Sequence, residues 1–300
     1  MPVYMQFPVA VGLGFSLLLA ACGGPGEEGD GQRTDSLATD TSDAQTEIIG
    51  VGGKLFSIPS PVQTALAIRK AGLKYQKDLT APLERGGTLT TRTAQSMALG
   101  IYGADLAYVT VHRDGARAIG TMQVIEKLSS ALGVSNAFDR TLLERFKTNM
   151  NNEDSLLRFS GTAFRAADQY LKTNQSEDVS ALVLAGGWIE SLYLTISDPA
   201  ALKDQAMVDR IGEQKTTLTA LVELIAATDK DGNATALLAS LRELQAEFDS
   251  VTSTYTFEKP VTDAAAKTTY INSKSTVTIP AEKVTAITTK ITALRNMILA

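Results

Sequence analysis

Two carboxylates are the residues whose type and spacing could do chemistry in this sequence. Asp105 opens the segment DLAYVTV and Glu190 opens ESLYLTI, which repeat one pattern of acid, two residues, tyrosine, aliphatic, threonine and aliphatic. Each acid is the only charge in a stretch of 19 residues, 93–111 and 179–197. Two acids can serve as general acid and general base in a hydrolase if they lie roughly 5–10 Å apart in an open cleft. A carboxylate-dependent hydrolase is therefore one hypothesis.

A buried carboxylate must be paired, hydrogen-bonded or protonated, because an isolated buried charge is costly. Arg69 lies within the apolar arc of the helix expected after Pro61, so it points inward. Two interpretations follow. Arg69 bridges one acid while tyrosine or threonine hydroxyls satisfy the other, or Arg69 and both acids converge on one polar centre.

The same residues support two different roles. They could be satisfied core residues that give packing specificity. They could instead line a small-molecule site, because apolar walls with a few convergent polar groups are typical of such sites. Gly186 and Gly187 would then permit close approach of a ligand or a helix. The candidate binding residues are Asp105, Glu190, Arg69, Tyr102, Tyr108, Trp188 and Tyr193.

Other chemistry has little support in the sequence. One histidine and one cysteine exclude most metal sites and histidine-dependent nucleophiles, so no metal or cofactor is predicted and no catalytic residue is assigned. The segment DKDGN at 229–233 lacks the spacing of an EF-hand loop and reads as a turn. His112 lies two turns after Asp105 but has no nucleophile beside it. A net charge of −5 argues against nucleic acid as a partner.

The N-terminus is typical of an exported, lipidated protein. Residues 1–21 contain the apolar run VAVGLGFSLLLAA, which has the length of a secretory signal peptide. The run ends in Leu-Ala-Ala-Cys22, which resembles a bacterial lipobox, in which cleavage leaves the cysteine as a lipid-bearing N-terminus. Cys22 is the only cysteine, so a disulfide is excluded and a lipid such as palmitate is the expected modification. The expected partner is thus a membrane, reached through lipid on Cys22.

Residues 22–47 are acidic, rich in glycine and free of aromatic residues, which predicts a disordered tether. By resemblance to lipoproteins of this kind, glycine rather than aspartate at residue 23 favours the outer membrane. The protein would face the periplasm or the cell surface. Residues 48–300 are long enough for a folded domain with a large core.

Helical patterns dominate this domain, which predicts a mainly α fold, either a multi-helix bundle or stacked helical hairpins. After Ser253 the period changes to alternation, which predicts a half-buried β-hairpin near 254–279 before a last helix at 280–298. A further strand is expected within 48–58. The two single-acid segments align at an offset of 85 residues and indicate an internal repeat. Helices are expected from 61 to near Pro82 and over 90–113, 115–132, 138–150, 153–173, 177–197, 199–227 and 233–252.

The domain also resembles a known family. The segments IPSPVQTALAIRKAGLKYQKDL, GIYGADLAYVTV, GGWIESLYLTI and TTYINSKSTVTI are similar to those of a group of helical outer-membrane lipoproteins of Gram-negative bacteria. The resemblance implies export, lipidation and a helical fold, but no reaction. Three hypotheses remain: a non-enzymatic binding or envelope-scaffolding lipoprotein acting on another envelope protein, a receptor for a small ligand at Asp105, Glu190 and Arg69, and the hydrolase.

Overall fold

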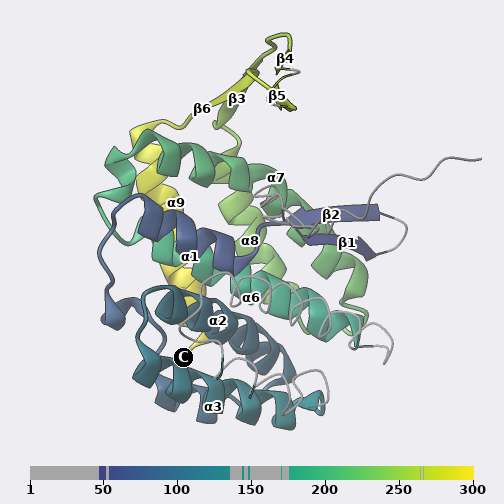
Figure 1. Ribbon diagram of the computed structural model, residues 1–300. Coiled ribbons are helices and arrows are strands. Elements are labelled where there is room, and N and C mark those ends of the chain that lie inside the picture. Colours follow the sequence, from purple (N-terminus) through teal and green to yellow (C-terminus); the bar gives the residue numbers. More distant parts are fainter. Residues whose placement is uncertain are drawn as a thin grey trace, which may run out of the picture. The chain divides into compact units, whose positions relative to one another are not determined.

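The computed structural model describes residues 47–51, 54–135, 144, 148, 170, 176–263, 265 and 267–300. Apart from residues 144, 148 and 170, the helices expected over 138–150 and 153–173 lie outside these ranges, as do the signal peptide 1–21 and the tether up to residue 46. The described part is mainly α with a small set of antiparallel strands (Figure 1), so the predicted fold class is confirmed.

Helices α2 (Arg92–Val111) and α6 (Glu177–Ile196) form the centre of the domain and pack against each other. Both are 20 residues long, and their bounds differ by the offset of 85 seen in the sequence. Helix α6 is long and apolar enough to cross a membrane, but 83% of its apolar window is buried inside the protein. The apolar composition of α6 is therefore explained by its position in the core.

Other helices surround this pair (Figure 1). Helix α1 (Pro61–Lys70) packs on both α2 and α6, and α3 (Gly115–Ala131) packs on α2. On the other side, α7 (Gln205–Thr228) packs on α6, α8 (Thr235–Phe248) packs on α7, and α9 (Ala281–Ile298) contacts α8, α6 and α2. A short 3₁₀ helix, η4 (Ala201–Lys203), precedes α7 where the sequence predicted helix from 199.

The first helix ends earlier than predicted. Helix α1 stops at Lys70, and Gly72 follows with a φ of +73°, a left-handed conformation that favours glycine and ends helices. The chain then runs to Thr91 as a connector that contains only two short 3₁₀ helices, η1 (Lys77–Leu79) and η2 (Leu83–Gly87). We call residues 79–82 the buried connector, because Thr80 and Ala81 are enclosed in the core.

In the described ranges, the strands form three two-stranded antiparallel sheets. Strands β1 (Glu47–Val51) and β2 (Lys54–Ile58) pair with each other, where the sequence predicted one strand. Between α8 and α9, β3 (Thr252–Thr256) pairs with β6 (Lys274–Thr278), and β4 (Val261–Asp263) pairs with β5 (Thr268–Tyr270). This second segment, residues 252–278, is the β-arm.

The β-arm departs from the predicted half-buried hairpin. Val277 is buried and its Cγ1 lies against Gly212 of α7. Tyr255, Phe257 and Ile271, which share its odd-numbered positions, are exposed. Alternation alone does not show whether a neighbouring element covers the apolar face, and α7 covers only the base of the arm.

Candidate functional site

The central helices cross at backbone contact distance. A Cβ added to Gly100 would lie 1.9 Å from the carbonyl oxygen of Val183, and one added to Gly186 would lie 1.9 Å from that of Met97. Gly187 also faces the backbone of Gly100. The glycine pair predicted to allow close approach therefore admits a neighbouring helix, and no space for a ligand remains at this crossing.

Glu190 lies deeper along α6 and forms a bidentate ion pair with Arg295 of α9. Arg295 donates from Nε to Oε2 of Glu190 at 2.6 Å and from Nη2 to Oε1 at 2.9 Å. The Glu190 carboxylate has no exposed surface, and Arg295 is 6% exposed. The guanidinium also lies over the ring of Tyr193 at 4.2 Å from its centroid, a cation–π contact. The arginine that pairs with the acid is therefore Arg295, not Arg69.

Asp105 on α2 is equally enclosed but has a different partner. Its Oδ2 accepts a hydrogen bond of 2.8 Å from the backbone N–H of Ala81. Its Oδ1 accepts no hydrogen bond from a donor in the part of the chain that the structure describes. Burial, followed by the negative charge of nearby Glu190 and a side-chain hydrogen bond between the two acids, raises the pKa of Asp105 well above its usual range. Asp105 is thus the neutral member of the acid pair, because an ionised carboxylate here would leave one charged oxygen without a donor.

The electrostatics of the other two groups agree with this assignment. Burial raises the pKa of Glu190, and the adjacent Arg295 charge opposes that rise. Burial alone would lower the pKa of Arg295, but the charge of Glu190 and the hydrogen bonds to it raise the pKa above its ordinary value. The centre of Asp105, Glu190 and Arg295 therefore holds one negative and one positive charge. We call these three residues the polar centre.

The polar centre and its neighbours hold the buried connector. Arg295 donates from Nη2 to the carbonyl of Leu79 at 2.8 Å, and Asp105 accepts from Ala81 N–H. Tyr102 donates from its hydroxyl to the carbonyl of Pro82 at 2.6 Å. On α3, Arg117 donates to the hydroxyl of Thr80 at 3.0 Å and to the carbonyl of Ala81 at 2.6 Å. An irregular segment has no regular ladder to satisfy its backbone, and these side chains supply the partners that burial requires.

The remaining predicted binding residues lie around this centre without joining it. Tyr102 is fully buried, and this burial raises its pKa to about 12. Tyr108 accepts a hydrogen bond of 3.0 Å from the backbone N–H of Gln76. Trp188 faces α7, where its indole N–H donates to Gln214 at 2.9 Å. Cys22 lies outside the described residues.

Arg69 is placed at the end of α2. Its Nη1 donates to the carbonyl of Val111 at 3.1 Å, in the last turn of the helix, where a cation is favourable. The adjacent His112 stacks on Tyr75 with ring centroids 5.3 Å apart. Burial, and then the charge of Arg69, lowers the pKa of His112. His112 is thus kept neutral in an aromatic cluster with Tyr75 and Tyr108.

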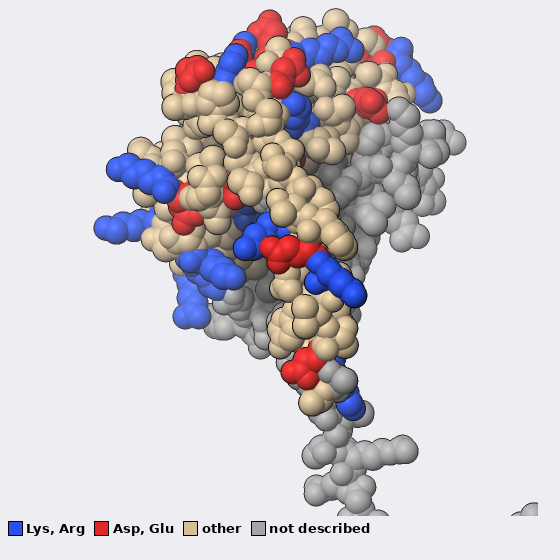
Figure 2. Space-filling view, turned by 90° about the horizontal axis from the view of Figure 1, so that it is seen from above, with Lys and Arg blue, Asp and Glu red and all other residues tan. Residues whose placement is uncertain are grey.

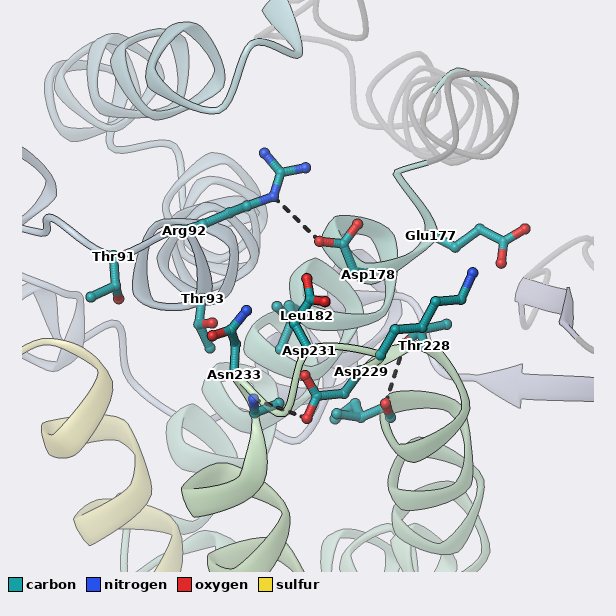
Figure 3. Close-up of a pocket in the computed structure, with 13 residues that line it drawn as sticks. Thr91, Arg92, Thr93, Glu177, Asp178, Leu182, Thr228, Asp229, Asp231 and Asn233 are labelled. Atoms are coloured by element: carbon teal, nitrogen blue, oxygen red, sulfur yellow. Dashed lines mark hydrogen bonds and ion pairs between the residues drawn. The ribbon is translucent and has the colours of Figure 1, made fainter.

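One polar cavity of about 610 Å³ opens elsewhere, where the N-termini of α2 and α6 meet the loop between α7 and α8 (Figure 3). Arg92 and Asp178 form an ion pair of 3.3 Å at its edge. Asp229 accepts a hydrogen bond of 3.1 Å from Ala234 N–H, which confirms the turn expected for DKDGN. Among the residues that the structure describes, no group of three or more acids, histidines or cysteines could hold a metal ion. Neither member of the acid pair lines this cavity.

Sequence reasoning missed Arg295, although a signal for it was present. Arg295 lies four residues after Ile291 and three before Ile298, both buried, so a helical wheel of the last helix places it on the apolar face. Arg117 gives no such signal, because its role depends on the path of the connector. The two carboxylates have no exposed surface, so the contacts of both arginines favour a structural role for these residues over a catalytic one.

Comparisons of the chain with protein families, curated proteins and solved structures found no match.

Proposed function

We propose that this chain is a lipid-anchored envelope protein whose helical domain serves in binding or scaffolding without catalysing a reaction. The lack of solvent access to the polar centre supports the non-catalytic part of this proposal. A hydrolase needs its two carboxylates in an open cleft. Here Asp105 and Glu190 have no exposed surface and are engaged with Ala81 and Arg295.

The anchored part of the proposal is supported by the sequence. The lipobox-like Leu-Ala-Ala-Cys22 follows a signal-like apolar run and precedes an acidic segment rich in glycine. The tether that the sequence predicts, about 25 residues long, would reach roughly 25–30 Å on average if it is disordered, enough to hold the domain clear of lipid headgroups. The resemblance to helical outer-membrane lipoproteins of Gram-negative bacteria points the same way.

Metabolic labelling tests the anchor. The full chain is produced in a Gram-negative host grown with an alkyne analogue of palmitate, and the membranes are separated by density. We expect label on the wild type, in the outer-membrane fraction, and none on Cys22→Ser. Because Cys22 is the only cysteine, no other thiol can take the label. A wild-type chain that carries no label would overturn the proposal.

A receptor for a small polar ligand is a second candidate, and the cavity of Figure 3 is the observation that favours it. The polar centre does not serve as its site. A thermal-shift screen of amino acids and sugars tests this candidate, with Lys230→Met and Asp231→Asn as variants at exposed lining positions. A ligand that fits this cavity raises the melting temperature of the wild type more than that of the variants.

A further inference from the structure

The β-arm carries most of the exposed apolar side chains that the structure describes. Seven large hydrophobic residues are exposed in the described ranges, and five of them lie in the arm. Scattered apolar side chains are ordinary on a surface, whereas a concentration of them marks an interaction site. The five are Tyr255, Phe257, Val261, Tyr270 and Ile271, with exposed fractions of 51–76%.

These side chains gather toward the outer half of the arm. Val261 and Tyr270 are directly opposed across β4 and β5, so they share one face of the ribbon. Phe257 and Ile271 lie where the β3–β6 pair passes into the β4–β5 pair, a junction braced by two hydrogen bonds of 3.1 Å between Ser273 and the backbone of Glu258. Figure 1 shows this part of the arm projecting away from the helices.

The charge of the arm differs in sign from that of the chain. Its residues include three lysines, Lys259, Lys267 and Lys274, and two acids, for a net charge of +1, whereas the whole chain carries −5. One of the acids, Asp263, accepts a hydrogen bond of 2.9 Å from Ala265 N–H and so belongs to the turn. Lysines beside apolar side chains can bury their stems and hold their ammonium groups at a charged surface.

We propose that the β-arm binds the surface of an anionic lipid bilayer, with Phe257, Val261 and Ile271 entering the interfacial layer and the lysines contacting the headgroups. Tyrosine rings suit the same depth, because one end is apolar and the other is polar. A projecting ribbon also has the shape for insertion into a layer, which a concave groove lacks. This contact is separate from lipid on Cys22.

A second copy of the chain fits the arm less well than a bilayer does. In the described helices, Ile119 and Met297 are the other exposed large hydrophobic residues, at 44% and 46%, and they lie on α3 and α9. They offer no apolar acceptor that matches the arm. In Figure 2, seen from the side toward which the arm projects, positive and negative side chains are interspersed and separated by uncharged surface.

A fluorescent label at one position tests the proposal. In the full chain with Cys22→Ser, Ile271→Cys provides a single thiol for a polarity-sensitive fluorophore. Gln123→Cys, on an exposed position of α3, is the matched control. With phosphatidylglycerol vesicles, we expect a blue shift and increased intensity for the label at 271 and no change at 123. With phosphatidylcholine vesicles, the label at 271 should respond far less, which separates binding by the arm from binding by the apolar segment at residues 9–21.

Charge removal gives a second readout. Replacement of Lys259, Lys267 and Lys274 by glutamine should weaken binding to phosphatidylglycerol vesicles about fivefold per lysine, on the order of 100-fold for all three. The melting temperature should not change, because these residues are exposed.

Three results would overturn the proposal: equal responses at 271 and 123, an unchanged affinity after the lysines are replaced, or a label response that needs no vesicles and grows with protein concentration. The last result would assign the arm to a second copy of the chain. Labelling of Cys22 with lipid is measured separately, so failure of the anchor and failure of the arm are distinguishable.

Discussion

Replacement of Arg295 by methionine should be among the most destabilising single changes in this domain. The change removes two hydrogen bonds to Glu190, at 2.6 and 2.9 Å, and one of 2.8 Å to the carbonyl of Leu79. It leaves the carboxylate of Glu190 enclosed and without a cation. Loss of one partner of a buried ion pair costs about 3–5 kcal/mol. For a domain of this size, we expect the melting temperature to fall by roughly 6–20 °C.

Removal of both charges should cost much less. In the double variant Glu190→Leu with Arg295→Met, no charge remains without a partner, and apolar side chains of similar volume often replace a buried pair at little or no cost. The carbonyl of Leu79 still loses its donor, which costs about 1–3 kcal/mol. We therefore expect the double variant to be more stable than Arg295→Met alone, with a coupling energy of about 3 kcal/mol or more.

Urea unfolding followed by circular dichroism at neutral pH measures Arg295→Met, Glu190→Leu and the double variant. Lys290→Met is the matched control, because Lys290 on the same helix makes an ion pair of 3.2 Å with Glu243 in which the side chains are 32% and 71% exposed. An exposed pair of this kind contributes about 0–1 kcal/mol. An Arg295→Met variant as stable as Lys290→Met, or a double variant whose loss is the sum of the single losses, would refute the role assigned to the ion pair.

Two further predictions concern Asp105 and the helix crossing. The folded-state pKa of Asp105 is raised above the unfolded value of about 3.9. The stability that Asp105 contributes is therefore fully present below about pH 3.9 and is lost as the pH rises through the folded-state pKa. Asp105→Asn, which resembles the neutral form, should therefore gain stability relative to the wild type above about pH 4, by up to about 1.4 kcal/mol per pH unit, and parallel urea profiles would contradict this. Gly100→Ala should lower the melting temperature by several degrees because its Cβ would meet the Val183 carbonyl, whereas Gly115→Ala, with open space around it, should be neutral or stabilising.

The sequence predicted the central helices well because their pattern is simple. Segments apolar on every side have to be buried whatever their neighbours are, and Asp105 and Glu190 then have to point into the core with them. The bounds of α2 and α6 lie within two residues of the predicted ones, 90–113 and 177–197. The meeting of the two acids follows from the same feature, since central helices pack on each other.

The identity of the paired arginine could not be chosen from the sequence. Arg69 and Arg295 both lie on apolar faces of their helices, and a helical wheel does not say which end of α2 each helix reaches. Arg295 lies 105 residues from Glu190, and their contact depends on how α9 crosses α6. The connector was harder still to predict. The sequence predicted that α1 continued through it, and a helix satisfies its own backbone hydrogen bonds and needs no side-chain partners.

The path of that connector explains why two corresponding positions of the apparent repeat carry different acids. At Asp105 the hydrogen-bond donor is a backbone N–H that passes next to α2, 2.8 Å from the carboxyl oxygen, and a short side chain reaches it. At Glu190 the donor is a guanidinium that arrives from α9 and also has to reach Leu79, and the longer glutamate accepts from two of its nitrogens, Nε and Nη2. Because one acid is neutral and the other is balanced by Arg295, their proximity costs less than that of two charged carboxylates. The two segments share the burial of their helices, and the difference between their acids reflects what each of them holds in place.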